Sequence, residues 1–252
     1  MTDLSPATAA GAKTLAMDVG GSGLKAGLLG PDGALLGERQ RVDTPHPSPP
    51  SAVVPLLLGL AAKLPGYDRL SVGFPGVVRD GVVRTAPNLG TRDWAGFDLA
   101  AALSKALGKP ARVLNDASVQ GLGVIAGHGL ECVITLGTGL GFAIYQDGKL
   151  LPHLELSQHP AHKGKTYDQY LGAAALKEVG AEKWQRRVRR AISQIETLVG
   201  YDSLLIGGGN AKHVNFELPA NARIVDNEAG ILGGVRLWEA QQDAAFGVTR
   251  AS

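Results

Sequence analysis

The feature that most constrains this chain is a glycine-rich turn between two apolar strands, which occurs twice. The first copy spans residues 14–29, where apolar stretches flank Asp18-Val19-Gly20-Gly21-Ser22-Gly23. The second spans residues 131–145, where similar stretches flank Gly137-Thr138-Gly139. Each copy continues into a turn that contains Asp-Gly, at residues 32–33 and 147–148. This repetition predicts two lobes of similar architecture, each opening with a β-meander.

The segments between and after these turns alternate between strand and helix patterns. Short apolar runs bounded by glycine or proline predict strands, and longer periodic runs with capping residues predict helices. Ser51 is the expected N-cap of one helix and Asp98 of another. The expected strands are 34–36, 70–74, 111–114 and 204–206, and the expected helices are 51–64, 98–107, 182–199 and 230–242.

This alternation predicts an α/β fold whose chemistry lies at the ends of strands. We expect residues 1–13 to form a disordered tail, residues 14–116 a first lobe and residues 117–252 a second lobe. The closing helix is expected to belong to the second lobe or to complete the first.

Composition excludes several classes of protein. The 252 residues carry 25 Lys and Arg against 23 Asp and Glu, so bulk electrostatic binding to nucleic acid or an anionic membrane is not expected. The single cysteine, Cys132, excludes an internal disulfide framework and a multi-cysteine zinc site. Neither a membrane span nor a secretory signal is recognisable in the sequence. We therefore expect a cytoplasmic protein.

The first glycine turn has the residues of a phosphate site. Glycines let backbone N–H groups approach an anion, while Ser22 adds a hydroxyl and Lys25 a positive charge. Asp18, at the strand end, can hold a hydrated Mg²⁺ that bridges phosphate oxygens. The spacing differs from that of the Gly-x4-Gly-Lys-Ser/Thr loop, so a tight hairpin without a ligand is the alternative. The candidate phosphate-binding residues are Gly20, Gly21, Ser22, Gly23 and Lys25.

The second glycine turn offers the same chemistry through the backbone of Gly137 and Gly139 and the hydroxyl of Thr138. It leads into a strand, so it lacks the helix of a dinucleotide-binding fingerprint. One glycine turn per lobe favours a phosphate chain held between the lobes. Gly207-Gly208-Gly209 follows strand 204–206 and either receives a nucleotide base or ribose or simply joins strand to loop.

Candidate acid–base and sugar-binding residues also follow predicted strands or turns. Asn115-Asp116 ends strand 111–114, where Asp116 either takes the proton of an attacking hydroxyl or caps the following helix. Asn88 and Glu155 are residue types that bind sugar hydroxyls, and the alternative for each is a polar loop residue.

A basic run, Arg186-Arg187-Val188-Arg189-Arg190, lies on the predicted helix 182–199. It is either a solvated helix face or a track for a long polyanion, to which Lys163 and Lys165 can contribute. The histidines within residues 153–162 match no recognised zinc spacing.

Five motifs occur along the chain in an order that resembles the ROK family of sugar kinases and sugar-responsive repressors. The resemblance spans residues 14–239, and Asp43-Thr44-Pro45 and Gly81-Val82-Val83 are most similar to the polyphosphate/ATP glucokinase branch. The five motifs are Leu15-Ala16-Met17-Asp18-Val19-Gly20-Gly21-Ser22, Gly73-Phe74-Pro75-Gly76-Val77-Val78, Val113-Leu114-Asn115-Asp116-Ala117, Thr135-Leu136-Gly137-Thr138-Gly139-Leu140-Gly141 and Ile206-Gly207-Gly208-Gly209.

This resemblance implies an actin-like ATPase fold, of the ribonuclease H-like class, with two lobes and an active site in the cleft. It implies a kinase that phosphorylates the 6-hydroxyl of a hexose such as glucose, with Mg²⁺ and with ATP or polyphosphate as the donor. A homodimer is typical of the family. By the resemblance, Asp116 is the catalytic base, the glycine turns bind phosphate, Gly208 and Gly209 lie near a nucleotide, and Asn88, Asn115 and Glu155 bind the sugar.

The chain departs from the family pattern in two places. The family's Glu-Leu-Gly-His is here Glu155-Leu156-Ser157-Gln158 followed by His159, so either Gln158 replaces the sugar-contacting histidine or His159 takes its place. The cysteine-rich zinc loop of many members is missing, as it is in the polyphosphate glucokinase branch. Because of Gln158, a sugar sensor without turnover is the alternative function. Asp116 favours the enzyme, since sugar binding alone does not need a base. A repressor is not expected, because fewer than twenty residues precede the first glycine turn.

Overall fold

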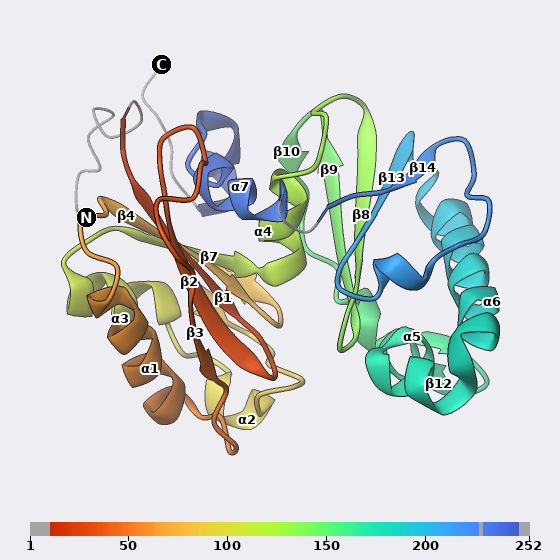
Figure 1. The fold of residues 1–252 in the computed structure, drawn as a ribbon, viewed down its shortest axis with the longest axis horizontal. Helices are drawn as coiled ribbons and strands as arrows, with labels where there is room; N and C mark the ends of the chain where they lie inside the picture. Colours follow the sequence, from red (N-terminus) through yellow and green to blue (C-terminus); the bar gives the residue numbers. More distant parts are fainter. Residues whose placement is uncertain (1–10, 227–228, 247–252) are drawn as a thin grey trace. The chain divides into compact units, whose positions relative to one another are not determined.

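The computed structural model describes residues 11–226 and 229–246, and its contacts divide the chain into two units (Figure 1). The first unit takes the chain as far as Gly123 and again from Gly230, and the second is Val124–Ala229. Helix α4 (Asp116–Leu122) therefore belongs to the first unit, which extends beyond the boundary expected after residue 116. The closing segment also belongs to the first unit.

The first unit is built on a five-stranded sheet with the strand order β3-β2-β1-β4-β7. Strands β1 to β3 pair in antiparallel fashion as a meander, whereas β1, β4 and β7 are parallel. The strands are β1 (Thr14–Val19), β2 (Gly23–Leu29), β3 (Gln40–Asp43), β4 (Arg69–Phe74) and β7 (Ala111–Asn115).

The second unit repeats this arrangement with the strand order β10-β9-β8-β13-β14. An antiparallel meander again precedes two parallel strands on the far side of the first strand. The repetition of one strand order confirms the predicted α/β fold and the duplicated architecture. The strands are β8 (Leu130–Leu136), β9 (Leu140–Gln146), β10 (Lys149–Leu150), β13 (Ser203–Gly207) and β14 (Ala222–Ile224).

The third strand of the first meander is not the one that the sequence predicted. Residues 34–36 form no strand, and Leu35 makes an isolated bridge with Leu29. Their side chains gain little from pairing there, because Leu35 and Leu36 are exposed and Gly37 turns the chain with a φ of 95°. The strand that pairs with β2 is β3, which begins at Gln40.

Helix α1 shows how proline sets a helix start. We expected Ser51 as its N-cap, but the helix begins at Pro50 and no side chain caps it. Proline suits the first helical position because its φ is already helical. It also lacks an N–H, and an N–H at this position would have no hydrogen-bond partner within the helix. The helices of the first unit are α1 (Pro50–Ala62), α2 (Thr91–Trp94), α3 (Leu99–Leu107), α4 and α7 (Ala229–Arg236), followed by the 3₁₀ helix η4 (Ala240–Phe246).

Helix α3 follows the prediction closely. The Asp98 side chain accepts a hydrogen bond from Ala101 N at 2.8 Å, and Gly108 ends the helix with a φ of 64°. The predicted closing helix is shorter than expected, because α7 ends at Arg236 and the chain continues as η4. Two short strands, β5 (Val78–Arg79) and β6 (Val82–Val83), pair beside α3.

The long helix of the second unit begins before its predicted start. Helix α6 runs from Ala173 to Val199, but Gly180 has non-helical angles (φ 75°, ψ 162°) that divide it. The predicted helix 182–199 is the segment after this break. The remaining elements are η2 (Leu156–Gln158), β11 (Pro160–His162), β12 (Lys165–Thr166), α5 (Tyr167–Leu171) and η3 (Ala211–His213).

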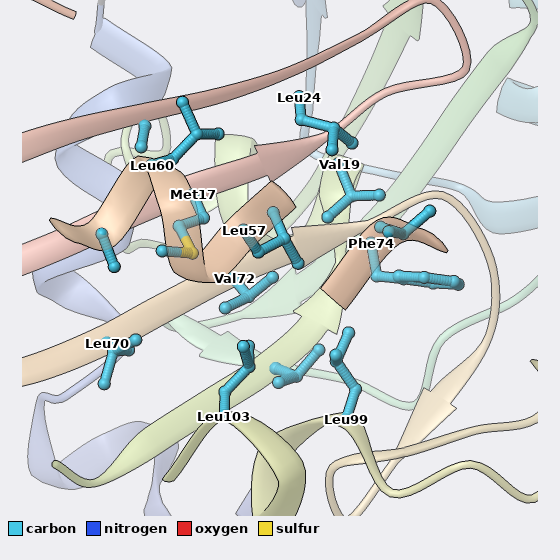
Figure 2. Packing of buried hydrophobic residues seen from close by; sticks show 14 of the residues in the cluster. Met17, Val19, Leu24, Leu57, Leu60, Leu70, Val72, Phe74, Leu99 and Leu103 are labelled. Carbon is cyan, nitrogen blue, oxygen red and sulfur yellow. The ribbon is translucent and has the colours of Figure 1, made fainter. Parts of the chain in front are cut away.

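Each unit has its own hydrophobic core. In the first, side chains of α1 and α3 pack against the apolar face of the sheet, as Figure 2 shows for Leu57, Leu103 and Val72. In the second, α6 contributes Trp184 and Val188 from one face. Residues three to four positions apart share a helix face, so the spacing of the buried α6 side chains is that of an amphipathic helix. Among the described residues, no helix is both long and apolar enough to cross a membrane.

Arg112 of β7 holds the end of the described chain, α7 and η4, against the sheet of the first unit. The Arg112 guanidinium donates to Leu237 O at 2.8 Å and to Asp243 Oδ1 at 2.7 Å. It also lies 4.5 Å from the centre of the Trp238 ring and 4.6 Å from that of Phe246. Both members of the ion pair are almost fully buried, so each charge depends on the other for compensation.

We predict that Asp243→Ala destabilises the protein by roughly 3–5 kcal/mol, because it leaves the buried Arg112 charge without its carboxylate partner. Urea unfolding of the full chain measures this loss. Asp43→Ala is the matched control, because it removes a carboxylate from a solvent-exposed ion pair with Arg41 and should change stability little. Equal effects of the two substitutions would contradict the prediction.

Candidate active site

The glycine turn of the first unit is held tightly by backbone and side chains. Gly20 N donates to Gly23 O at 3.0 Å, and Thr44 Oγ1 donates to Gly20 O at 2.6 Å. A Cβ on Gly20 would lie 2.8 Å from Gly23 O, so a side chain does not fit there without movement. Thr44 belongs to the Asp43-Thr44-Pro45 segment of the sequence resemblance, and it supports the turn directly.

Two cations and two carboxylates lie beside this turn, and one of the pairs joins Arg41 Nη2 to Asp43 Oδ1 at 3.1 Å. Asp18 and Lys25 are opposite each other on β1 and β2, with Lys25 Nζ 3.2 Å from Asp18 Oδ2. Lys25 is in turn opposite Arg41 on β3, and Arg41 donates to Ser22 O at 3.3 Å. Arg41 was not among the residues predicted from the sequence. Its position two residues before the Asp43-Thr44-Pro45 motif is the signal that could have identified it.

Asp18 fits the requirements of a magnesium site in one respect. The described residues contain no group of three or more His, Cys, Asp or Glu side chains that could hold a metal by itself. Mg²⁺ bound with phosphates needs one or two protein carboxylates, and waters and phosphate oxygens complete its shell. Asp18, partly exposed at a strand end beside the glycine turn, can supply such a carboxylate.

The carboxyl ends of the parallel strands bring Asp116 close to β4. Asp18 is opposite Gly73 on β4, and Phe74 at the end of β4 is opposite Asn115 on β7. A Cβ on Gly73 would lie 3.2 Å from Asp116 Cα, so the absence of a side chain at Gly73 admits Asp116. Asp18 and Asp116 thus both lie at the edge of the sheet where α/β proteins bind ligands.

Asn115 and Asp116 have different local roles. The Asn115 side chain caps α4 by accepting from Ser118 N at 3.2 Å, and its Nδ2 donates to Gly76 O at 3.2 Å. Asp116 is the first residue of α4, and its Oδ1 accepts from Ala117 N at 2.8 Å. Of the two residues, it is therefore Asn115 that caps the helix, whereas Asp116 remains partly exposed. The amide of Asn115, expected to bind sugar, is engaged within the protein.

Asn88 lies beside the first glycine turn, far from it in sequence. A Cβ on Gly21 would lie 3.8 Å from Asn88 Cβ, and the Asn88 side chain is exposed. The structure thus brings Asn88 together with the glycine turn within one unit, at a position from which its amide can reach a polar ligand.

The glycine turn of the second unit is supported differently. Gly137 N donates to Gly139 O at 3.0 Å, while Gly137 O accepts from Asn210 Nδ2 at 3.0 Å. Leu140 N donates to Asp168 Oδ1 at 2.7 Å, and a Cβ on Gly139 would collide with this carboxylate. The exposed Thr138 is the residue of the turn whose hydroxyl is available at the surface.

A chain of polar side chains leads from Glu155 to this turn. Ser157 Oγ donates to Glu155 Oε1 at 2.5 Å, and Gln158 Nε2 donates to Ser157 Oγ and to Asp168 Oδ2, both at 3.1 Å. His159 is exposed, and its ring lies 6.4 Å from that of Tyr167. The structure thus brings Gln158, rather than its neighbour, onto the carboxylate of Asp168.

The two carboxylates of this network differ in their electrostatics. Burial raises the pKa of Glu155, but the nearby His153 and the hydrogen bond from Ser157 outweigh it and hold that pKa below its usual range. The pKa of Asp168 is raised, chiefly by burial and also by the negative charge of Glu155. The hydrogen bond from Leu140 N opposes this rise without cancelling it. In its ionised form each of these groups acts only as a hydrogen-bond acceptor, which suits the recognition of hydroxyl groups.

Asp168 was not among the site residues predicted from the sequence. It lies in the first turn of α5, and Thr166 and Gln169 form a capping box around it. The pattern Thr-x-x-Gln is a helix-start signal that could have placed Asp168 at an exposed helix end. Its contact with the glycine turn, in contrast, joins residues 28 positions apart and depends on tertiary structure.

The glycines after β13 are not equivalent. Gly208 has a φ of 87°, and a Cβ there would lie 2.5 Å from Leu136 N. Gly209 has no heavy atom within 4 Å of its Cβ position. Gly208 therefore allows the chain to pass close to the end of β8, whereas Gly209 leaves open space of the kind expected near a nucleotide.

Two sheets of identical strand order, each with a glycine turn after its first strand, define an actin-like ATPase fold. The profile of the ROK family matches residues 14–153. Polyphosphate glucokinase of Mycobacterium tuberculosis (strain CDC 1551 / Oshkosh) is 33% identical over 235 residues, which cover 86% of this chain and 88% of that protein. The chain belongs to the ROK family.

Solved structures agree with this assignment. The inorganic polyphosphate/ATP-glucomannokinase of Arthrobacter sp. strain KM superposes with a TM-score of 0.80 at 33% identity, covering 89% of this chain and 97% of that one. A ROK family glucokinase of Streptomyces griseus, in complex with glucose and AMPPNP, has a TM-score of 0.72 at 20% identity, covering 89% and 98%. At the lower identity, the likeness concerns the fold.

We predict that Gly208→Ala destabilises the protein by roughly 1–3 kcal/mol, because alanine is strained at positive φ and its Cβ would meet the backbone of β8. Gly209→Ala is the matched control and should leave stability nearly unchanged. Urea unfolding measures both variants. A Gly209→Ala variant as unstable as Gly208→Ala would contradict the distinction between the two glycines.

We also predict that Gln158→Ala raises the pKa of Asp168 further, because the Gln158 hydrogen bond stabilises the carboxylate. Carboxyl ¹³C NMR during a pH titration measures this pKa. His159→Ala removes the neighbouring side chain and should leave the pKa unchanged. A pKa that stays constant or falls in Gln158→Ala would show that the hydrogen bond is not formed in solution.

Proposed function

We propose that this protein transfers a phosphoryl group from polyphosphate or ATP to the 6-hydroxyl of a hexose, with glucose as the preferred acceptor. The observation that carries the proposal is the position of Asp116. Its carboxylate lies at the carboxyl end of β7, in the same unit as the phosphate-type glycine turn that follows β1. The names of the relatives at 33% identity, polyphosphate glucokinase and polyphosphate/ATP-glucomannokinase, support the choice of donor and acceptor.

In the proposed reaction the sugar oxygen forms a bond to the terminal phosphorus of the donor, and the bond to the bridging oxygen breaks. The hydroxyl proton passes to the Asp116 carboxylate, and the shortened donor leaves with the electron pair. The N–H groups of Gly20-Gly21-Ser22 are assigned to phosphate oxygens, and Lys25 and Arg41 compensate their charge. Mg²⁺, when bound through Asp18, would neutralise charge on the phosphoryl group.

The polar network of the second unit is assigned to sugar recognition. Glu155, Gln158 and Asp168 present carboxylate and amide groups, which can accept and donate to several hydroxyls at once. Gln158 keeps both a donor and an acceptor where the family has histidine, so this departure is compatible with sugar binding. A sensor without turnover would not need a base at Asp116. We further propose a cytoplasmic homodimer, as expected for the family.

The direct test is an assay for sugar 6-phosphate with Mg²⁺, a panel of hexoses, and ATP and polyphosphate as separate donors. The proposal expects turnover with glucose and with one or both donors. Calorimetric sugar binding without turnover on any donor would reject the kinase and favour the sensor.

We predict that Asp116→Asn lowers kcat by about 10²–10⁴-fold, because general-base catalysis contributes that much and the amide cannot take the proton. Glucose binding, measured by calorimetry, should be retained. Asp80→Asn is the matched control: it is the same isosteric change at an exposed turn whose φ of 52° asparagine tolerates. Turnover of Asp116→Asn equal to that of the control would remove Asp116 from the mechanism.

A further inference from the structure

A basic pocket lies on the second unit, lined by residues of α5, α6 and the β11–β12 hairpin. Its volume is about 480 Å³. His162 and Tyr170 line it together with five cationic side chains, which are Lys163, Lys183, Arg186, Arg187 and Arg190.

The second segment of α6 supplies most of this charge from one face. Lys183, Arg186, Arg187 and Arg190 are spaced three, four and seven residues apart, and side chains at this spacing lie together on a helix surface. This basic face lies opposite the buried side of the helix, where Val188 enters the core. The basic run was expected to be either a solvated helix face or a track for a long polyanion. Most of its cations are exposed, and several of them line one open hollow together with Lys163, which favours the track.

The hairpin between β11 and β12 supplies the fifth cation at a conformational cost. Lys163 and Gly164 form its two-residue loop with φ of 50° and 76°, a pair of positive angles that favours Asn or Asp at the first position. The hairpin between β9 and β10 has the same pair of angles and does use Asp147 before Gly148. Lysine at position 163 is therefore not explained by turn preference, and it places a positive charge at the rim of the pocket.

Little of this positive charge is compensated by the residues around it. Glu182 pairs with Arg186 at 2.5 Å, but that carboxylate is 90% exposed and its ion pair is weak. Arg187 is fixed by donating to Tyr170 O at 3.1 Å and by lying 4.8 Å from the Tyr170 ring centre. Burial and then the charges of Arg190, Lys163 and Arg187 lower the pKa of His162, as expected in a region of positive potential.

The pocket and the second glycine turn lie on different sides of α5. Asp168 of this helix contacts the turn through Leu140 N, whereas Tyr170 contacts the pocket through His162 and Arg187. Side chains two positions apart on a helix point in different directions. A group bound at the second glycine turn is therefore separate from an anion held in the pocket.

We infer that this pocket binds an extended segment of inorganic polyphosphate, as a site separate from the first glycine turn, to which the transferred phosphate is assigned. The inference rests on the proposed function for the identity of the donor. A flexible chain with one negative charge per phosphate suits several separate cations around a hollow, and each cation that it neutralises adds to the salt dependence of binding. Nucleic acid would call for aromatic faces on which its bases stack, but Arg187 lies 4.8 Å from the centre of the Tyr170 ring and His162 lies 5.5 Å from it, so this ring is already occupied.

The test compares Arg190→Gln and the double variant Lys183→Gln/Arg190→Gln with matched controls that lose equal charge elsewhere. Arg189→Gln is the single control, because Arg189 is on the same helix but lies over Phe216, 4.7 Å from its ring centre. Arg189→Gln/Lys105→Gln is the double control, with Lys105 exposed on α3 of the first unit. Binding of fluorescently labelled polyphosphate of long and short chain length is measured by anisotropy at several salt concentrations, and turnover is measured with each donor.

We expect the double pocket variant to weaken binding of long polyphosphate by about five- to tenfold relative to its control, with a shallower salt dependence. Binding of tripolyphosphate and KM for ATP should remain unchanged. Equal weakening of long and short chains, or effects no larger than those of the controls, would overturn the inference. Tighter pocket-dependent binding of single-stranded RNA than of long polyphosphate would also overturn it. If the pocket substitutions weaken binding of long polyphosphate but the protein does not use polyphosphate in turnover, the binding site is supported and polyphosphate is rejected as the donor.

Discussion

The first unit is completed by the closing segment of the chain, α7 and η4. This segment packs against the sheet of the first unit after the chain has passed through the second unit. Gly234 of α7 allows this approach, because a Cβ there would lie 3.0 Å from Ala16 Cβ of β1. Ser71 of β4 donates to Gly234 O at 2.5 Å and accepts from Trp238 Nε1 at 2.9 Å, and Arg112 of β7 lies over the same indole ring. The three parallel strands that carry the site at their carboxyl ends are thus completed by residues from the other end of the sequence. The second unit is an insertion between these two parts.

The two units use one strand order for different chemistry, and the difference lies in what surrounds each glycine turn. The first turn is supported by Thr44 and by Arg41, and the ion pairs Lys25–Asp18 and Arg41–Asp43 lie beside it. The second is supported by Asn210 and by the carboxylate of Asp168, which continues into a network of sugar-type ligands. The duplicated backbone therefore provides two equivalent turns. The side chains around them differ, and on this difference rest the proposed roles, phosphate binding for the first turn and sugar recognition beside the second.

Much of the fold could be predicted because its signals are local. The strands before the glycine turns and the Asp98 cap of α3 each depend on neighbouring residues, and the helical pattern of residues 182–199 identified the segment of α6 that follows Gly180. Predictions failed where several local options were similar in energy. Residues 34–36 have strand-like composition, yet β2 pairs with Gln40–Asp43, and the helix expected from Ser51 starts at Pro50. The turn at Gly37 separates residues 34–36 from the segment that pairs with β2, and the fixed φ of proline sets the start of α1.

The candidate site divides in the same way. By itself the sequence determined the glycine turns, the Asn115-Asp116 pair and the basic run of α6, because each is a contiguous pattern whose chemistry follows from residue type. Tertiary structure decided which of the paired residues caps α4, that Gln158 contacts Asp168, and that the basic residues line a hollow. These outcomes depend on contacts between residues distant in sequence, and the energies of such contacts arise only when folding removes water from between them.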